Sequence, residues 1–162
     1  MHKILVKVCG HSLDKRTVYV SDDLFYAVYQ HASKSLKDAM DLAYLTGQRP
    51  GDPLKLTHDD IVNIYLIIAQ EKTKQPLRIV ISGKLEQTIN RIIERKSELN
   101  NIANAVLVNE QGKKMTAAIL RNHFTHARKS AMLHNPEMAH AIKNFWFYDL
   151  RAKAADDTSD QR

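Results

Sequence analysis

Apolar residues recur every three or four positions through most of the chain. Leu24, Phe25, Val28 and Tyr29 form the first such stripe, and others run through residues 36–44, 85–93 and 120–131. This spacing is typical of amphipathic helices, which bury one face. We predict helices that begin at Ser21, at Ser35 in a Ser-x-x-Asp capping box, at Ser82 or Gly83, at Thr116 and at about Asp149.

Three shorter segments show a pattern typical of strands. Residues 61–69 are rich in β-branched and aromatic side chains, the polar residues 72–76 follow, and residues 77–81 are again apolar. This order predicts two antiparallel strands joined by a turn, and residues 105–108 are expected to form a short strand. The expected fold class is therefore mainly α with a small antiparallel β-sheet (α+β).

The segment between the second predicted helix and the first strand contains a candidate functional arginine. Gly47 lies where a helix C-cap belongs, because glycine enters the left-handed region without steric cost. Pro50 and Pro53 stiffen the turn that follows. Arg49 lies inside this turn, and the Asp52 carboxylate is three residues on, within reach of its guanidinium. The simpler interpretation is a corner between helices with a surface Arg–Asp pair.

Composition and charge limit the classes of protein to which the chain can belong. The 162 residues suit one domain with a real core, 44% of them are apolar, and the formal net charge is +6. This basic balance favours a polyanionic partner. A single cysteine, Cys9, excludes an internal disulfide and a cysteine-based zinc cluster, and it fits a reducing compartment such as the cytoplasm. No apolar run approaches the roughly 20 residues of a membrane span.

Three motifs resemble those of the tyrosine recombinases, the phage integrase family. Residues 46–52 (Thr-Gly-Gln-Arg-Pro-Gly-Asp) resemble the first arginine motif, residues 147–155 resemble the second, and residues 70–74 resemble the lysine hairpin between them. The resemblance covers residues 16–162, and it implies the family's catalytic-domain architecture there. Residues 1–15 are interpreted as a linker or a truncated end.

The resemblance implies a role for each motif residue, and phosphoryl chemistry supplies the reason. Cleavage of a DNA phosphodiester passes through a pentacoordinate phosphorane, whose charge needs fixed cations. Arg49 and Arg151 are the expected clamps, since each guanidinium forks onto two oxygens. Lys72 is the expected proton donor to the departing 5′-oxygen, and Lys74 is its alternative. The simpler interpretation of Arg151 is a helix-surface charge or a partner for Asp149, and that of the lysines is a solvated hairpin tip.

The chain departs from the family's pattern at two points. Tyr148 stands where the family usually has histidine, so we expect a phosphate contact from its hydroxyl without acid–base work; the alternative is a core aromatic. The family's nucleophilic tyrosine follows the second arginine, whereas all six tyrosines here precede Arg151. We therefore expect a fragment, cut at both ends, that is inactive on its own.

A basic stretch without carboxylates lies between Gly112 and Pro136. Such a stretch favours contact with DNA phosphates, although a solvated helix face is the simpler interpretation. Two imidazoles, His123 and His126, are too few to predict a metal site. No cofactor is expected. With the hairpin lysine, the predicted DNA-binding residues are Lys74, Lys113, Lys114, Arg121, Arg128 and Lys129.

The leading functional hypothesis is the catalytic domain of a phage or prophage site-specific recombinase. Its expected partners are duplex DNA at an attachment or recombination site and, in the full-length protein, further copies of itself. Type IB topoisomerases share much of the catalytic set, so strand relaxation is a related possibility. A non-catalytic DNA-binding module is the alternative from another class, and a general RNA-binding basic protein is a third.

Overall fold

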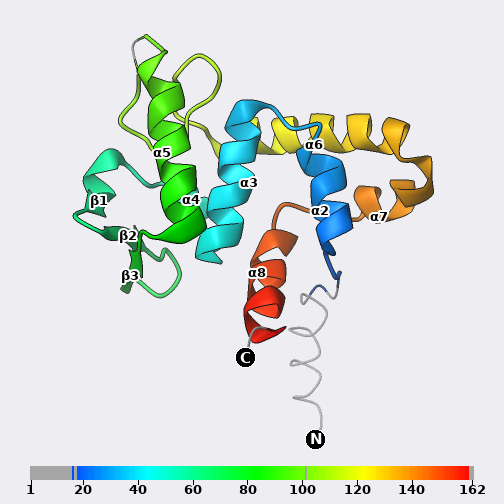
Figure 1. Cartoon of the computed structure of the whole chain (residues 1–162), viewed down its shortest axis with the longest axis horizontal. Coiled ribbons are helices and arrows are strands. Elements are labelled where there is room, and N and C mark those ends of the chain that lie inside the picture. The colour runs from blue at the N-terminus through cyan, green and yellow to red at the C-terminus, as the bar shows by residue number, and fades with distance from the viewer. Residues whose placement is uncertain (1–15, 17, 101, 161–162) are drawn as a thin grey trace, which may run out of the picture.

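The computed structural model describes residue 16 and residues 18–100 and 102–160, and most of them are helical (Figure 1). A three-stranded antiparallel sheet in the order β1-β2-β3 lies at one end of the molecule, beside α5. The expected fold class is therefore confirmed. The helices are α2 (Asp22–Tyr29), α3 (Lys34–Thr46), α4 (Gly51–Leu54), α5 (Gly83–Ser97), α6 (Ala117–His134), α7 (Ala139–Lys143) and α8 (Asp149–Asp160), with 3-10 turns at His58–Asp60 and Pro136–Met138.

Helix α3 is the centre of the core and contacts α5, α6 and α8. Leu36, Met40 and Leu42 on this helix are fully buried. The predicted capping box at Ser35 is wrong, because Ser33 is the N-cap and its hydroxyl accepts the Leu36 N–H at 3.2 Å. Ser35 lies inside the helix and is buried, and its hydroxyl donates to the Glu110 carboxylate at 2.8 Å.

The sheet contains a tight turn that the sequence pattern did not predict. Residues 61–69 do not form one strand: β1 (Ile61–Val62) pairs with β2 (Tyr65–Ala69) across a turn in which Asn63 has a φ of 56°. Asparagine tolerates this left-handed conformation better than most residues, so the turn costs little. The return strand β3 (Pro76–Val80) pairs with β2 as expected, with Tyr65 opposite Val80.

Two further expectations need correction. Residues 105–108 form isolated bridges, Ala105 with Thr57 and Val108 with Lys114, instead of a strand. The short helix α7 follows α6 after the 3-10 turn at Pro136–Met138, and the apolar periodicity did not predict it. The predicted segment 1–15 lies outside the described residues, and the assignment of residues 16–162 to one domain stays a prediction. No helix in the described part of the chain has the length and apolar character that a membrane crossing needs.

Candidate functional site

The predicted clamp Arg49 lies in the turn between α3 and α4. Helix α3 ends at Gly47, which has a φ of 64° and donates its N–H to the Ala43 carbonyl at 2.9 Å. The Arg49 carbonyl accepts the Asp52 N–H at 2.9 Å and so begins α4. The half-buried Arg49 side chain makes no hydrogen bond or ion pair with another described residue, which leaves its guanidinium available to a ligand.

The predicted pairing of Asp52 with Arg49 is absent from the described ion pairs. Asp52 is only 3% exposed, and its carboxylate accepts the Glu71 N–H at 3.2 Å. A second contact runs in parallel, in which the Gln70 amide donates to the Gln48 side-chain oxygen at 2.6 Å. Asp52 and Gln48 therefore tie the Arg49 turn to the hairpin between β2 and β3.

The two candidate lysines of that hairpin lie beyond these contacts. Lys72 and Lys74 are both exposed, and neither ammonium contacts a described acceptor. Lys74 adopts a left-handed conformation with a φ of 61°, and its N–H donates to the Gln70 carbonyl at 2.8 Å. The hairpin therefore holds its base with defined hydrogen bonds while its tip carries two free ammonium groups.

The second predicted clamp, Arg151, lies in the first turn of α8. It is half-buried and lines a cavity of about 450 Å³ together with Thr46 and Gly47 at the end of α3. Helix α8 approaches α3 so closely that a Cβ at Gly47 would lie 3.7 Å from the Ala154 Cβ. Arg151 is thus brought beside the C-cap that precedes Arg49 by two residues.

Tyr148 lies immediately before α8 and is 47% exposed. The interpretation of this residue as a core aromatic is therefore wrong, whereas its neighbour Phe145 is fully buried and packs edge-to-face on Phe124. The Tyr148 carbonyl accepts the Arg151 N–H at 3.2 Å, so the two residues share the first turn of the helix.

The partner of Asp149 is Arg16, a residue that no sequence motif indicated. The Arg16 guanidinium donates to both Asp149 oxygens, from Nε at 2.7 Å and from Nη2 at 3.0 Å. The alternative that pairs Asp149 with Arg151 is therefore wrong. The two partners are 133 residues apart in the sequence, and no local pattern joins positions so distant.

The remaining predicted cations divide into two groups. Arg121 and Arg128 line an apolar cavity of about 380 Å³ with Pro50 and Gly51, directly after Arg49. Arg128 is half-buried there, and burial lowers the pKa of its guanidinium. The second group is Lys113, Lys114 and Lys129, which are exposed. No cavity or hydrogen bond of the described residues links their ammonium groups to the Arg49 turn.

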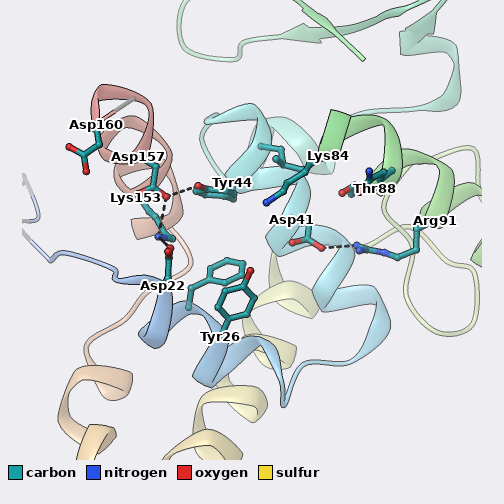
Figure 2. A pocket seen from close by; sticks show the side chains of 13 residues that line it. Asp22, Tyr26, Asp41, Tyr44, Lys84, Thr88, Arg91, Lys153, Asp157 and Asp160 are labelled. Atoms are coloured by element: carbon teal, nitrogen blue, oxygen red, sulfur yellow. Dashed lines mark hydrogen bonds and ion pairs between the residues drawn. The ribbon is translucent and has the colours of Figure 1, made fainter. Parts of the chain in front are cut away.

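A cavity of about 690 Å³ on the other side of α8 contains none of the predicted site residues (Figure 2). Lys153, only 3% exposed, donates to Asp22 at 2.7 Å and lies 3.1 Å from Asp157, which also accepts the Tyr44 hydroxyl. Burial alone would lower the pKa of Lys153, but these two carboxylates outweigh it and raise the pKa. The network anchors α8 to α2 and α3.

The histidines do not form a metal site within the described residues, where no group of three or more His, Cys, Asp or Glu side chains is suitably placed. His123 bonds through Nδ1 to the Ser33 hydroxyl at 2.9 Å. His126 is exposed one turn along α6. His123 therefore contributes to the contact between α3 and α6.

Comparisons with known proteins agree with this architecture. The integrases of Escherichia phage lambda and Enterobacteria phage 434 are each 26% identical over 117 residues, which cover 68% of this chain and 33% of theirs. The chain thus spans about a third of the length of these relatives. The solved lambda integrase catalytic core superposes with a TM-score of 0.70 at 22% identity, over 90% of this chain and 88% of that chain.

A second solved structure, a lambda integrase tetramer bound to a Holliday junction, matches with a TM-score of 0.70 at 23% identity. The alignment covers 91% of this chain and 45% of that chain. At such identities these likenesses show a shared fold. The family model described as "Phage integrase family" matches residues 20–159, nearly the whole chain. The chain therefore belongs to the phage integrase family.

Proposed function

We propose that this chain is the DNA-binding part of the catalytic domain of a phage or prophage site-specific recombinase. In this proposal a longer protein uses it to cleave and rejoin DNA strands through a 3′-phosphotyrosyl intermediate. The observation that carries the proposal is the meeting of three segments: Arg151 lines a cavity with Gly47, and Asp52 joins the Arg49 turn to the Lys72 hairpin.

The proposed chemistry uses the cations that the described structure leaves free. Arg49 and Arg151 contact the non-bridging oxygens of one phosphate and stabilise the charge of the phosphorane. The tyrosyl oxygen bonds to phosphorus, the bond to the 5′-oxygen breaks, and Lys72 gives that oxygen a proton. The exposed Tyr148 hydroxyl donates a hydrogen bond to the same phosphate.

The chain alone is proposed to bind DNA without forming an adduct, because Tyr44, which lines the same cavity as Arg151, and two other tyrosines are held by contacts within the protein. Tyr29 and Tyr44 donate to Asp41 and Asp157, and burial together with these carboxylates raises the pKa of both phenols. Tyr65 lies under the Arg78 guanidinium, 4.2 Å from its ring centroid. Tyr148 shares a helical turn with Arg151, which suits a donor better than an in-line nucleophile.

We also propose contacts beyond the reacting phosphate. Lys74, Lys113, Lys114, Arg121 and Lys129 are exposed cations suited to backbone phosphates, whereas Arg128 is already bonded within the protein. Because the structurally similar lambda integrase has been solved as a tetramer bound to a Holliday junction, self-association on DNA is proposed for the longer protein. Because the proposed recombination acts on DNA, we place it in the cytoplasm.

The alternative is a DNA-binding module that occupies sites without reacting. Such a module would have the same phosphate-binding surface as the recombinase, so DNA binding alone does not separate the two functions. The shared prediction is tested first: duplex DNA should bind with a steep salt dependence and compete better than RNA. Binding that does not change between low and high salt would exclude both functions.

Adduct formation then separates enzyme from module. A suicide DNA substrate is incubated with a longer protein that carries this chain and a downstream tyrosine, and the products are denatured and separated by electrophoresis. A covalent protein–DNA band that Arg151→Ala removes supports the recombinase. A band formed by the chain alone and lost in Tyr148→Phe would show that Tyr148 is the nucleophile.

A further inference from the structure

Two arginines hold the segment that leads into α8. Arg128 on α6 donates from Nη1 to the carbonyls of Lys143 and Phe145, at 3.2 and 3.0 Å. Arg16 donates from Nη2 to the carbonyl between them, that of Asn144, at 2.7 Å. Three successive backbone carbonyls therefore have guanidinium donors, an arrangement that fixes a segment without regular secondary structure.

Arg16 also contacts the start of α8. Its guanidinium bonds both oxygens of Asp149, the first residue of the helix, and lies 3.4 Å from the ring centroid of Trp146. The Asp149 carboxylate in turn accepts the Trp146 N–H at 2.8 Å. Asp149 is 2% exposed, so its carboxylate is shielded from water, whereas the Arg16 side chain is 22% exposed.

The residues fixed in this way are those proposed to touch the phosphate. Tyr148 lies between Trp146 and Asp149, and Arg151 follows two residues after Asp149 on the first turn of α8. A rotation of that turn by one residue would swing the Arg151 side chain by about 100° around the helix axis. A small error at Asp149 thus becomes a large displacement of the guanidinium.

We propose that Arg16 is a positioning residue for the phosphate site: through Asp149 and Trp146 it sets the direction of Tyr148 and Arg151. The inference rests on the proposed function, since it assumes that Arg151 contacts DNA. Arg16 itself need not touch the substrate. A purely structural salt bridge would lower stability and leave the contribution of Arg151 to DNA binding unchanged.

The test is a double-mutant cycle on DNA affinity, measured with a short mixed-sequence duplex at low salt. In the native chain Arg151→Ala should weaken binding about tenfold, the effect of losing one charged hydrogen bond to a phosphate. In the Arg16→Ala background the same change should cost less than about twofold, because Arg151 is already misplaced.

Arg91→Ala is the matched control background. Arg91 also bonds a buried aspartate, Asp38 at 3.1 Å, but it lies on α5. Arg151→Ala should keep its tenfold effect there. If Arg16→Ala does not fold, Arg16→Lys takes its place, since lysine keeps the charge but cannot reproduce the fork and the stacking. Emission from Trp146, the only tryptophan, reports whether the contact with Arg16 is lost.

The outcomes separate this inference from the function on which it rests. A tenfold effect of Arg151→Ala in both the native and the Arg16 backgrounds would overturn the positioning role and leave the proposed function intact. No effect of Arg151→Ala in the native chain would reject the phosphate contact itself, and the inference with it. A reduced effect confined to the Arg16 variants supports the proposal.

Discussion

The contact between Asp52 and the Glu71 amide should hold the hairpin between β2 and β3 against the Arg49 turn. We consider Asp52→Ala, which removes a carboxylate that is 3% exposed and accepts one backbone N–H at 3.2 Å. A hydrogen bond to a charged group contributes about 1.5 to 3 kcal/mol. The length of this bond and the exposure of Glu71, whose N–H can turn to water, favour the lower end, so we expect a loss of about 1 to 2 kcal/mol.

A loss of this size is measurable in two ways. It corresponds to a fall in the melting temperature of about 2 to 8 °C for a domain of this length. Hydrogen exchange should show where the loss lies: the Glu71 amide and its neighbours at the base of the hairpin should exchange faster, whereas amides in the middle of α3 should change only as global stability does.

Two variants serve as controls for this prediction. Asp52→Asn keeps an oxygen acceptor in place and should retain part of the protection at Glu71. Asp59→Ala removes an exposed carboxylate that accepts from Asn104 at 3.0 Å, and it should change stability by less than about 0.5 kcal/mol. If Asp52→Ala lowered the melting temperature without faster exchange at Glu71, the proposed link between the turn and the hairpin would be wrong.

Three further predictions follow from the same geometry. Arg121→Ala should weaken duplex binding and reduce the slope of log affinity against log salt by about 1, as expected for one phosphate contact; an unchanged slope in a salt titration would remove Arg121 from the interface. Gly47→Ala should cost about 1 to 2 kcal/mol in urea unfolding because of the φ of 64°, and an unchanged midpoint would show that the turn relaxes freely. Burial, and then the Lys96 ammonium, lower the pKa of His58 below its usual 6.5, so the unfolded chain binds more protons at this residue and the free energy of unfolding should fall as the pH drops below about 6.5. The substitution His58→Asn should flatten this pH dependence. An equally steep curve in that variant would assign the dependence to another group.

Local patterns were sufficient to predict most of the helices. Ser21 and Thr116 both act as N-caps, with hydroxyls that accept the N–H three residues on, and Gly47 is the left-handed C-cap. These features depend on neighbours within one turn, and sequence spacing expresses them directly. The misplaced cap at Ser35 shows the limit, because Glu110, 75 residues away, recruits that serine for a tertiary contact.

The supporting contacts of the candidate site were not predictable in the same way. The motifs identified Arg49, Lys72 and Arg151, whose assignment to one phosphate stays a prediction. They gave no partner for Asp52 and no reason to notice Arg16, since both contacts join segments that only the fold brings together. A charged pair three residues apart is a weak guide when a backbone N–H from another segment competes for the buried carboxylate.

Arginine-selective chemical footprinting tests the central claim most directly, because it requires no substitution. The chain is modified in the presence of increasing amounts of duplex DNA, and each arginine is followed by mass spectrometry. Arg49 and Arg151 should be protected in parallel and lose protection at the same salt concentration, while Arg91, paired with Asp38 and Asp41, should react at a constant rate. Unchanged modification of either Arg49 or Arg151 at saturating DNA would contradict a shared phosphate site.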